Sequence, residues 1–250
     1  MLKNLKVYYF FILLSAFVAC TKQVDDTAVV IPPVTPTSIP TIKFFNVVDQ
    51  GKITVKLNGT VVSDSLAQYY PTTYITAKAD SNNIQLFKAS SRDTTILNIN
   101  VGLLKGKNYS CFIYKLGYDW KASIVTDNLT KPDSGYAGIR ILDFRTQSNT
   151  NYVSINLFSL GYITYTGTFP FIYRHFLDHS SFDFLTNFTP VMARPDYKIV
   201  VYNSTDNLVT RNNVTLGSKK LYSMILMTPA SITADSTANK YIFPDVQEHY

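Results

Sequence analysis

The stretch Ile42-Lys43-Phe44-Phe45-Asn46 returns later in the chain as Ile139-Arg140-Ile141-Leu142-Asp143, and this repetition decides the fold. Three further matches follow in the same order: Ile53–Leu57 with Val153–Leu157, Ile84–Lys88 with Ile199–Asn203, and Tyr109–Ile113 with Tyr222–Leu226. Apolar and polar residues alternate in Ile53–Leu57 and in Val153–Leu157, as a half-buried strand requires. We therefore predict two tandem copies of one all-β module.

The predicted modules cover residues 41–129 and 136–250, joined by the short linker Thr130–Gly135. Turn signals such as Asn58-Gly59 separate short alternating segments, a spacing that indicates an antiparallel β-sandwich in each module. The opening strands carry adjacent apolar residues, Phe44-Phe45 and Ile141-Leu142. We expect both strands to be central in their sheets and covered on both faces.

The composition agrees with strands and restricts the partners. Aromatic residues make up 14% of the 250-residue chain, and Ile, Val and Thr are abundant, a mixture that favours β-structure. The formal net charge is +6. Without Lys3 and Lys6 the chain has 21 basic and 17 acidic residues, a net charge of +4. These charges are dispersed, and the sequence shows no basic cluster of the kind that binds nucleic acid. We expect no nucleic-acid partner.

The N-terminus has the layout of a bacterial lipoprotein signal peptide. Lys3 and Lys6 precede the apolar run Val7–Val18. The stretch Ser15-Ala16-Phe17-Val18-Ala19-Cys20 contains the end of this run and the cysteine that follows it. About 20 apolar residues are needed to span a bilayer as a helix, so this run is a secretory signal rather than a span. We predict a signal peptide over residues 1–19 and lipidation of Cys20. The alternative is an ordinary signal peptide cleaved nearby, with Cys20 incidental.

Residues 20–40 read as a lipidated cysteine followed by a proline-rich tether, because four prolines favour an extended spacer. Asp25 and Asp26 resemble the acidic export signals of surface lipoproteins in Bacteroidota. The predicted location is the outer membrane, lipid-anchored, at the cell surface or on the periplasmic face. With Cys20 acylated, Cys111 has no disulfide partner and is expected to be a small buried hydrophobe.

The first module resembles a domain of unknown function found in Bacteroidota cell-envelope lipoproteins. The resemblance rests on Ile42–Asn46, Ile53, Val55 and Asn58-Gly59, and on the later strand region from Val101 to Tyr114. The second module departs from the pattern, since Asn156-Leu157-Phe158 stands where the Asn-Gly turn would be. The resemblance implies immunoglobulin-like sandwiches on a cell-surface lipoprotein, and it transfers no catalytic residues.

The sequence contains no motif that indicates catalysis, a cofactor or a metal. His175 and His179 have the i, i+4 spacing of a helical zinc site, but Phe176 stands where such a site has Glu. Their flanks look like strands, so we expect a pair of surface loop histidines. Asp119, Asp143, Asp178 and Asp183 show no spacing that pairs them. We predict that the protein is not an enzyme and holds no metal or cofactor.

A long aromatic insertion, residues 158–197, distinguishes the second module from the first. Loops on a rigid sandwich often carry binding residues, and exposed Tyr and Phe rings suit sugars or partner proteins. We propose ligand-binding roles for residues of this insertion and of one hairpin in the first module: Tyr162, Tyr165, Phe169, Tyr173 and Trp120. The alternative is that these rings belong to added strands and face a core.

The leading functional hypothesis is a non-catalytic cell-surface module that binds glycan or protein. The membrane would be its second partner, through the N-terminal lipid. The runner-up is a structural or accessory subunit of an outer-membrane complex, and a hydrolase is the third hypothesis.

Overall fold

The repeated stretches form strands that pair in the same register. In this computed structural model, β1 (Thr41–Asn46) pairs in parallel with β7 (Asn108–Leu116), and β9 (Tyr136–Asp143) pairs in parallel with β15 (Leu221–Met227). Ile42 lies opposite Tyr109, and Ile139 lies opposite Tyr222. The repeat aligns Ile42 with Ile139 and Tyr109 with Tyr222, so the two parallel pairs have equivalent registers. The structure describes residues 39–48, 51–68, 70–145, 152–159, 162–165, 171–175, 177–202, 207–227 and 243–249.

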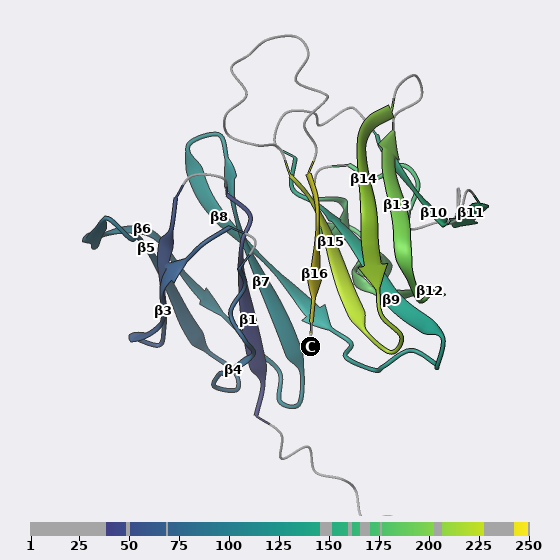
Figure 1. Cartoon of the computed structure of the whole chain (residues 1–250). Helices are drawn as coiled ribbons and strands as arrows, with labels where there is room; N and C mark the ends of the chain where they lie inside the picture. The colour runs from purple at the N-terminus through teal and green to yellow at the C-terminus, as the bar shows by residue number, and fades with distance from the viewer. Residues whose placement is uncertain are drawn as a thin grey trace, which may run out of the picture. The chain divides into compact units, whose positions relative to one another are not determined.

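The first pair of sheets has the strand orders β4-β1-β7-β8 and β3-β2-β5-β6 (Figure 1). Its remaining strands are β2 (Ile53–Leu57), β3 (Thr60–Leu66), β4 (Ile75–Thr76), β5 (Asn82–Lys88), β6 (Ser91–Val101) and β8 (Asp119–Asp127). Alternate residues of both sheets, such as Phe44, Val55 and Leu86, point into one core and are fully buried. Cys111 is part of this core, as predicted, and burial raises the pKa of its thiol to about 12.

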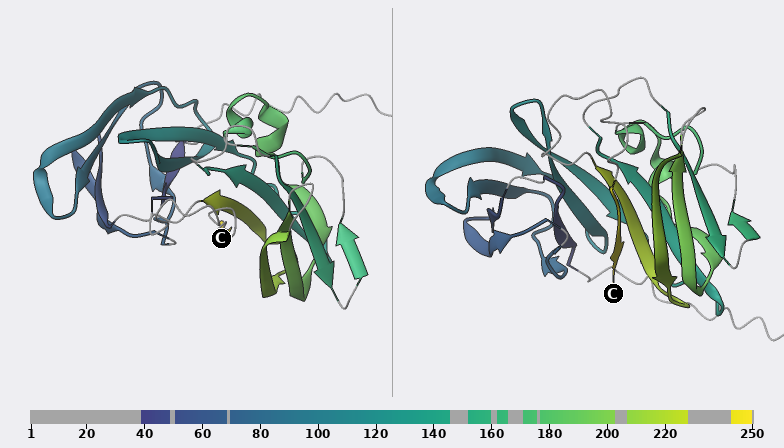
Figure 2. Two further views of the ribbon diagram at one scale, coloured as in Figure 1. Left: turned by 90° about the horizontal axis from the view of Figure 1, so that it is seen from above. Right: turned by 45° about the horizontal axis from the view of Figure 1, so that its top comes forward.

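The second pair of sheets has the strand orders β12-β9-β15-β16 and β11-β10-β13-β14 (Figure 1). Its remaining strands are β10 (Ser154–Ser159), β11 (Tyr162–Tyr165), β12 (Thr189–Met192), β13 (Arg194–Tyr202), β14 (Asn207–Leu216) and β16 (Phe243–Glu248). Ile141, Ile155, Ile199 and Met224 lie in the core between these two sheets. Two 3-10 turns, η1 (Asp178–Ser180) and η2 (Asp183–Thr186), lie beside β8 and β9 and are green in Figure 2.

The predicted all-β sandwich class is confirmed, with one refinement. The sheets that contain β1 and β9 are mixed, because each holds one parallel pair among antiparallel neighbours. The Asn58-Gly59 turn is confirmed as well: both residues have positive φ, 53° and 82°, as a two-residue hairpin turn requires. The division into modules at residues 41–129 and 136–250 stays a prediction.

A third apolar cluster joins the two pairs of sheets. Phe45, Phe112 and Tyr114 come from the first pair, and Leu142 and Ile225 come from the second. This cluster explains the adjacent apolar residues in β1 and β9: Phe44 and Ile141 face their own cores, while Phe45 and Leu142 face this shared one. The prediction that both opening strands are central and covered on both faces is therefore confirmed.

Residues 36–250 form one compact unit. The predicted signal peptide, Cys20 and the tether up to residue 38 lie outside the described residues. Within the described ranges, no helix is long and apolar enough to cross a bilayer.

Candidate binding site

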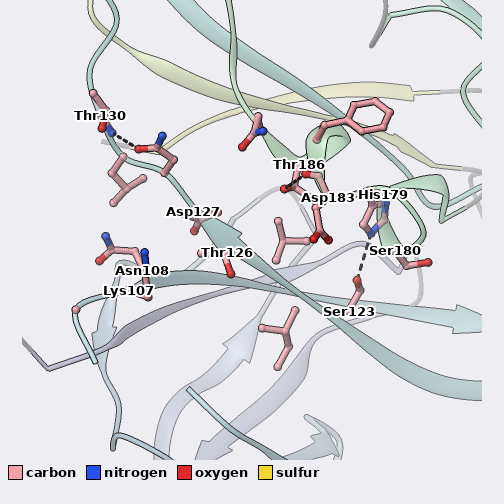
Figure 3. A pocket seen from close by; sticks show the side chains of 17 residues that line it. Lys107, Asn108, Ser123, Thr126, Asp127, Thr130, His179, Ser180, Asp183 and Thr186 are labelled. Carbon is pink, nitrogen blue, oxygen red and sulfur yellow. Dashed lines mark hydrogen bonds between the residues drawn. The ribbon is translucent and has the colours of Figure 1, made fainter. Parts of the chain in front are cut away.

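A groove of about 1020 Å³ lies between β8 and the turns η1 and η2. Figure 3 shows Ser123, Thr126 and Asp127 along β8, with His179 and Thr186 on the turns. The β8 wall belongs to the first pair of sheets, and the turns belong to the aromatic insertion of the second. The groove is therefore a product of tertiary packing between segments that are distant in sequence.

Hydroxyl and amide side chains dominate the lining of this groove. They are Asn108, Ser123, Thr126, Asn128, Thr130, Ser180, Thr186 and Asn187. Lys107 and Asp183 add one charge of each sign, and the charge of Asp127 is paired with Arg140. Phe184 contributes an aromatic ring that is 44% exposed. The groove is thus polar, nearly neutral and rich in groups that both donate and accept hydrogen bonds.

Arg140 of β9 ties the two walls of the groove together. Its Nη2 lies 2.7 Å from Asp127 Oδ1, at the end of β8, and both side chains are fully buried. Its Nη1 donates to the main-chain oxygen of Thr186 in η2 at 3.4 Å. The guanidinium also stands over the Phe188 ring, 4.6 Å from the centroid. Arg140 therefore sets the separation of β8 from η2.

A buried hydrogen-bond network continues from this ion pair. Tyr74 and Ser110 donate to Asp127 Oδ2, each at 2.7 Å. His249 Nδ1 lies 2.9 Å from the Tyr74 hydroxyl oxygen, and its Nε2 lies 2.7 Å from Ser223 Oγ. Because Tyr74 gives its proton to Asp127, His249 Nδ1–H donates to Tyr74 and Nε2 accepts from Ser223. Burial, reinforced by Asp127, raises the pKa of Tyr74 well above its usual value.

The repeat explains part of this network. Arg140 Nε donates to Ser223 Oγ at 2.7 Å across β9 and β15, where the two residues are register partners. The aligned residues of the first stretch are Lys43 and Ser110, which are register partners across β1 and β7. Lys43 Nζ donates to the main-chain oxygen of Glu248 at 3.2 Å. Burial lowers the pKa of Lys43 below its usual value, although Asp127 and Glu248 act in the opposite direction.

His179 is buried in the groove wall, which corrects the expectation of a surface loop histidine. Only 3% of its surface is exposed, and its ring packs 5.1 Å from that of Phe144. Its Nε2 lies 3.2 Å from Ser123 Oγ on the opposite wall. Nδ1 is buried and has no hydrogen-bond partner among the described residues. Sequence flanks could not reveal this burial, because Phe144 and Ser123 come from distant segments.

The two buried histidines predict that acid destabilises the fold. Burial, reinforced by nearby Arg140, lowers the pKa of His249 to about 2; burial lowers that of His179 to about 4. In the unfolded chain both titrate near 6.5, so below this pH the unfolded state binds protons that the folded state does not. We expect the free energy of unfolding to fall as pH drops from 6.5 towards 4, by up to about 1.4 kcal/mol per unit for each histidine. Urea titrations at several pH values measure the slope.

His179→Gln is the matching variant for this experiment. It removes one titrating group, so its stability should decline less steeply between pH 6.5 and 4 than that of the wild type. Equal slopes in the two proteins would show that His179 does not resist protonation in the folded state.

A second feature is a cluster of exposed aromatic rings near the start of β10. Tyr152 is 55% exposed and Tyr173 is 67% exposed; their rings meet edge to face at a centroid distance of 6.2 Å. His175 packs against Tyr152 in the same manner, at 5.4 Å. We call Tyr152, Tyr173 and His175 the aromatic cluster.

The structure disperses the residues predicted to bind a ligand. Tyr173 is exposed in the aromatic cluster, and its ligand-binding role stays a prediction. Tyr162 and Tyr165 are in β11, which pairs with β10, so this part of the insertion is an added strand. The side chains of these two tyrosines and all of Phe169 lie outside the described residues.

The second half of the insertion and the first-module hairpin are resolved in more detail. Phe171 is fully buried in the second core, so this ring of the insertion follows the alternative interpretation, in which the rings face a core. Trp120 is half-buried against the first core, with Lys115 Nζ 4.8 Å from its ring centroid. Tyr118, at the turn itself, is the fully exposed ring of that hairpin. A ligand-binding role for Trp120 stays a prediction.

Sequence reasoning missed the β8 wall of the groove, Tyr152 and Arg140. The β8 residues carry no motif, and Tyr152 lies before the insertion. A positively charged residue inside an apolar strand, as at Arg140, was the available signal, because a buried charge needs a partner.

In the described part of the chain, no group of three His, Cys, Asp or Glu side chains could hold a metal ion.

The fold places the chain among all-β sandwich proteins. No protein-family model matches the sequence, and no curated protein is similar to it. Two solved structures show a distant likeness, each at 10% identity with a TM-score of 0.23. The first is a family 41 carbohydrate-binding module from streptococcal virulence factors, described in work on α-glucan recognition; 74% of this chain and 93% of that one are covered.

The second is a family 26 carbohydrate-binding module of Eubacterium rectale Amy13K in complex with maltoheptaose, with 79% of this chain and 98% of that one covered. At this level of similarity, neither structure bears on the function of the present chain. The functional conclusion rests on the groove and the aromatic cluster.

Proposed function

We propose that this protein is a non-catalytic, lipid-anchored protein of the cell envelope that binds a neutral glycan in the groove between β8 and η1–η2. The observation that carries the proposal is the lining of the groove, which combines hydroxyl and amide side chains with one exposed ring. A saccharide offers alternating hydroxyl groups and apolar ring faces. Paired donors and acceptors match the hydroxyls, and a phenyl ring such as that of Phe184 matches a sugar face.

The electrostatics of the groove favour an uncharged ligand. Lys107 and Asp183 oppose each other in sign, and Arg140 already neutralises Asp127. His179 stays neutral near pH 7, because burial lowers its pKa to about 4.

Phe184→Ala tests the groove. We expect it to weaken glycan binding about tenfold or more, equivalent to about 1.4 kcal/mol, because the sugar face loses its ring. Isothermal titration with maltoheptaose, cellohexaose, xylohexaose, chitohexaose and mannohexaose, and pull-down on the parent polysaccharides, would identify the ligand and measure the loss. Asn187→Ala should weaken binding to a similar or smaller extent, since it removes hydrogen bonds.

Tyr118→Ala is the control, because Tyr118 is fully exposed at the turn between β7 and β8 and does not line the groove. It should leave both affinity and melting temperature unchanged. If none of these glycans binds, the proposed function is wrong. Binding that survives both Phe184→Ala and Asn187→Ala would place the site elsewhere.

The lipid anchor is the second part of the proposal, and it rests on the residues before the described region. The basic start, short apolar run and Cys20 support lipidation, and the proline-rich segment supports a spacer between membrane and body. The resemblance of Ile42–Asn46 and its surroundings to Bacteroidota lipoproteins supports a cell-envelope location. Each buried CH₂ of an acyl chain contributes about 0.8 kcal/mol, so several chains together anchor a protein firmly.

Cys20→Ser should abolish the anchor. We expect the wild type to incorporate labelled palmitate and to partition into detergent, and the variant to do neither and to remain in the aqueous fraction. Cys111→Ser serves as the control, because Cys111 is buried in the first core and cannot accept lipid. Palmitate labelling that persists in Cys20→Ser would overturn the assignment.

A further inference from the structure

The aromatic cluster is presented by strained backbone. Tyr173 has a φ of 52° and Leu177 a φ of 53°, both in the left-handed region. Such a conformation costs about 1–2 kcal/mol for a residue with a side chain. Strain of this kind persists only where the surroundings enforce it, and it gathers at binding and catalytic sites. The backbone at Tyr173 is thus held in this conformation by its surroundings.

Buried ionic contacts provide the enforcement. Arg174 and Asp178 form an ion pair with side chains that are 1% and 2% exposed, and Arg174 Nη2 donates to Asp178 Oδ1 at 2.8 Å. The main-chain N–H of His175 donates to the same carboxylate at 3.2 Å. Two main-chain hydrogen bonds, 2.8 and 2.9 Å long, join Arg174 to Val153, next to Tyr152. These contacts hold both tyrosines on one rigid base.

The same segment leads directly into the groove. His179 and Ser180, which line the groove, follow Asp178 in the chain. Ser180 is the seventh residue after Tyr173, and a fully extended chain spans at most about 3.6 Å per residue, so their Cα atoms lie within about 25 Å. The Arg174–Asp178 pair sits between them and fixes one with respect to the other.

We propose that the aromatic cluster is a second contact for the glycan that occupies the groove, so that the natural ligand is a polysaccharide and not a short oligosaccharide. This inference rests on the proposed function of the groove. Two exposed tyrosine rings at an edge-to-face angle offer apolar surfaces to sugar rings, while the groove supplies hydrogen bonds. Two contacts on one rigid body make the binding of a long chain tighter than that of a fragment that reaches only one of them.

The experiment compares a trisaccharide, which is short enough to occupy the groove alone, with its parent polymer, using the glycan from the panel above that the wild type binds. We expect Tyr173→Ala and Tyr152→Ala to weaken binding to the immobilised polymer about tenfold or more. Binding of the trisaccharide, measured by titration calorimetry, should change by less than about twofold. Tyr173→Phe should keep polymer binding, because the ring remains. Tyr118→Ala is the matched control for an exposed tyrosine.

The groove variant Phe184→Ala separates this inference from the proposed function. It should weaken the trisaccharide and the polymer alike. If Phe184→Ala weakens both ligands while Tyr173→Ala and Tyr152→Ala leave the polymer unaffected, the second contact is wrong and the groove stands. If Tyr173→Ala weakens the trisaccharide as much as the polymer, the cluster belongs to one short site and the inference fails. If no glycan of the panel binds, both ideas fail.

Discussion

Arg140→Met is expected to lower the free energy of unfolding by about 3–5 kcal/mol, the usual effect of removing one partner of a buried ion pair. The reason is that Asp127, fully buried beside Arg140, would keep its charge without its cation. Ser223 and the main chain of Thr186 would also lose hydrogen bonds from the guanidinium. Urea unfolding monitored by circular dichroism measures the loss.

Lys121→Met is the control for this variant. Lys121 lies 3.9 Å from Asp119, and both side chains are largely exposed, so the loss should stay within about 0.5 kcal/mol. Combining Arg140→Met with Asp127→Asn should recover part of the stability, because the neutral amide leaves no buried charge while its oxygen still accepts hydrogen bonds from Tyr74 and Ser110. A loss below about 1 kcal/mol in Arg140→Met alone would mean that the buried charge is tolerated without its partner.

Phe112→Ala is expected to cost about 3–5 kcal/mol, as truncation of a buried Phe usually does. Phe112 is fully buried in the shared cluster, stacked on Phe45 at a centroid distance of 4.6 Å and 5.3 Å from the ring of Phe144. Because this cluster joins the two pairs of sheets, the variant should also uncouple them. Calorimetry should then show two thermal transitions where the wild type shows one.

Phe44→Ala separates the two effects of this change. Phe44 is fully buried as well, but in the core between the first two sheets. It should cost a comparable free energy while leaving the shared cluster intact, so that a single transition remains. A single transition in Phe112→Ala would show that other contacts, such as Arg140 with Asp127, are sufficient to couple the sheets.

The strands and their central position could be predicted from the sequence. The alternation in Ile53–Leu57 and the doubled apolar residues at Phe44-Phe45 were enough to predict strands and their central position. Side chains alternate between the two faces of a strand with a period of two residues, so the pattern of one strand is visible in a short stretch of sequence. A turn such as Asn58-Gly59 depends only on the backbone conformation of its own residues. The registers of Ile42 with Tyr109 and of Ile139 with Tyr222 follow the same repeat.

The candidate site was only partly accessible by such reasoning. Tyr173 is exposed, whereas the sequence left open whether the rings of the insertion face solvent or a core. The burial of His179 was not predicted, and that of Phe171 was one of two alternatives, because an aromatic or histidine side chain in an irregular segment suits a core and a surface equally well. The side that such a residue takes depends on neighbours from other elements, such as Phe144 beside His179.

By itself, the sequence determined the all-β class, the repeated strands and the Asn-Gly hairpin, since each follows from residues that are close together in the chain. Only the tertiary structure decided that Arg140 meets Asp127, that β8 and η2 enclose a groove, and that Tyr152 stands beside Tyr173. The physical reason is desolvation. A buried charge or an unpaired polar atom is costly, and the partner that compensates it can come from any distance along the chain.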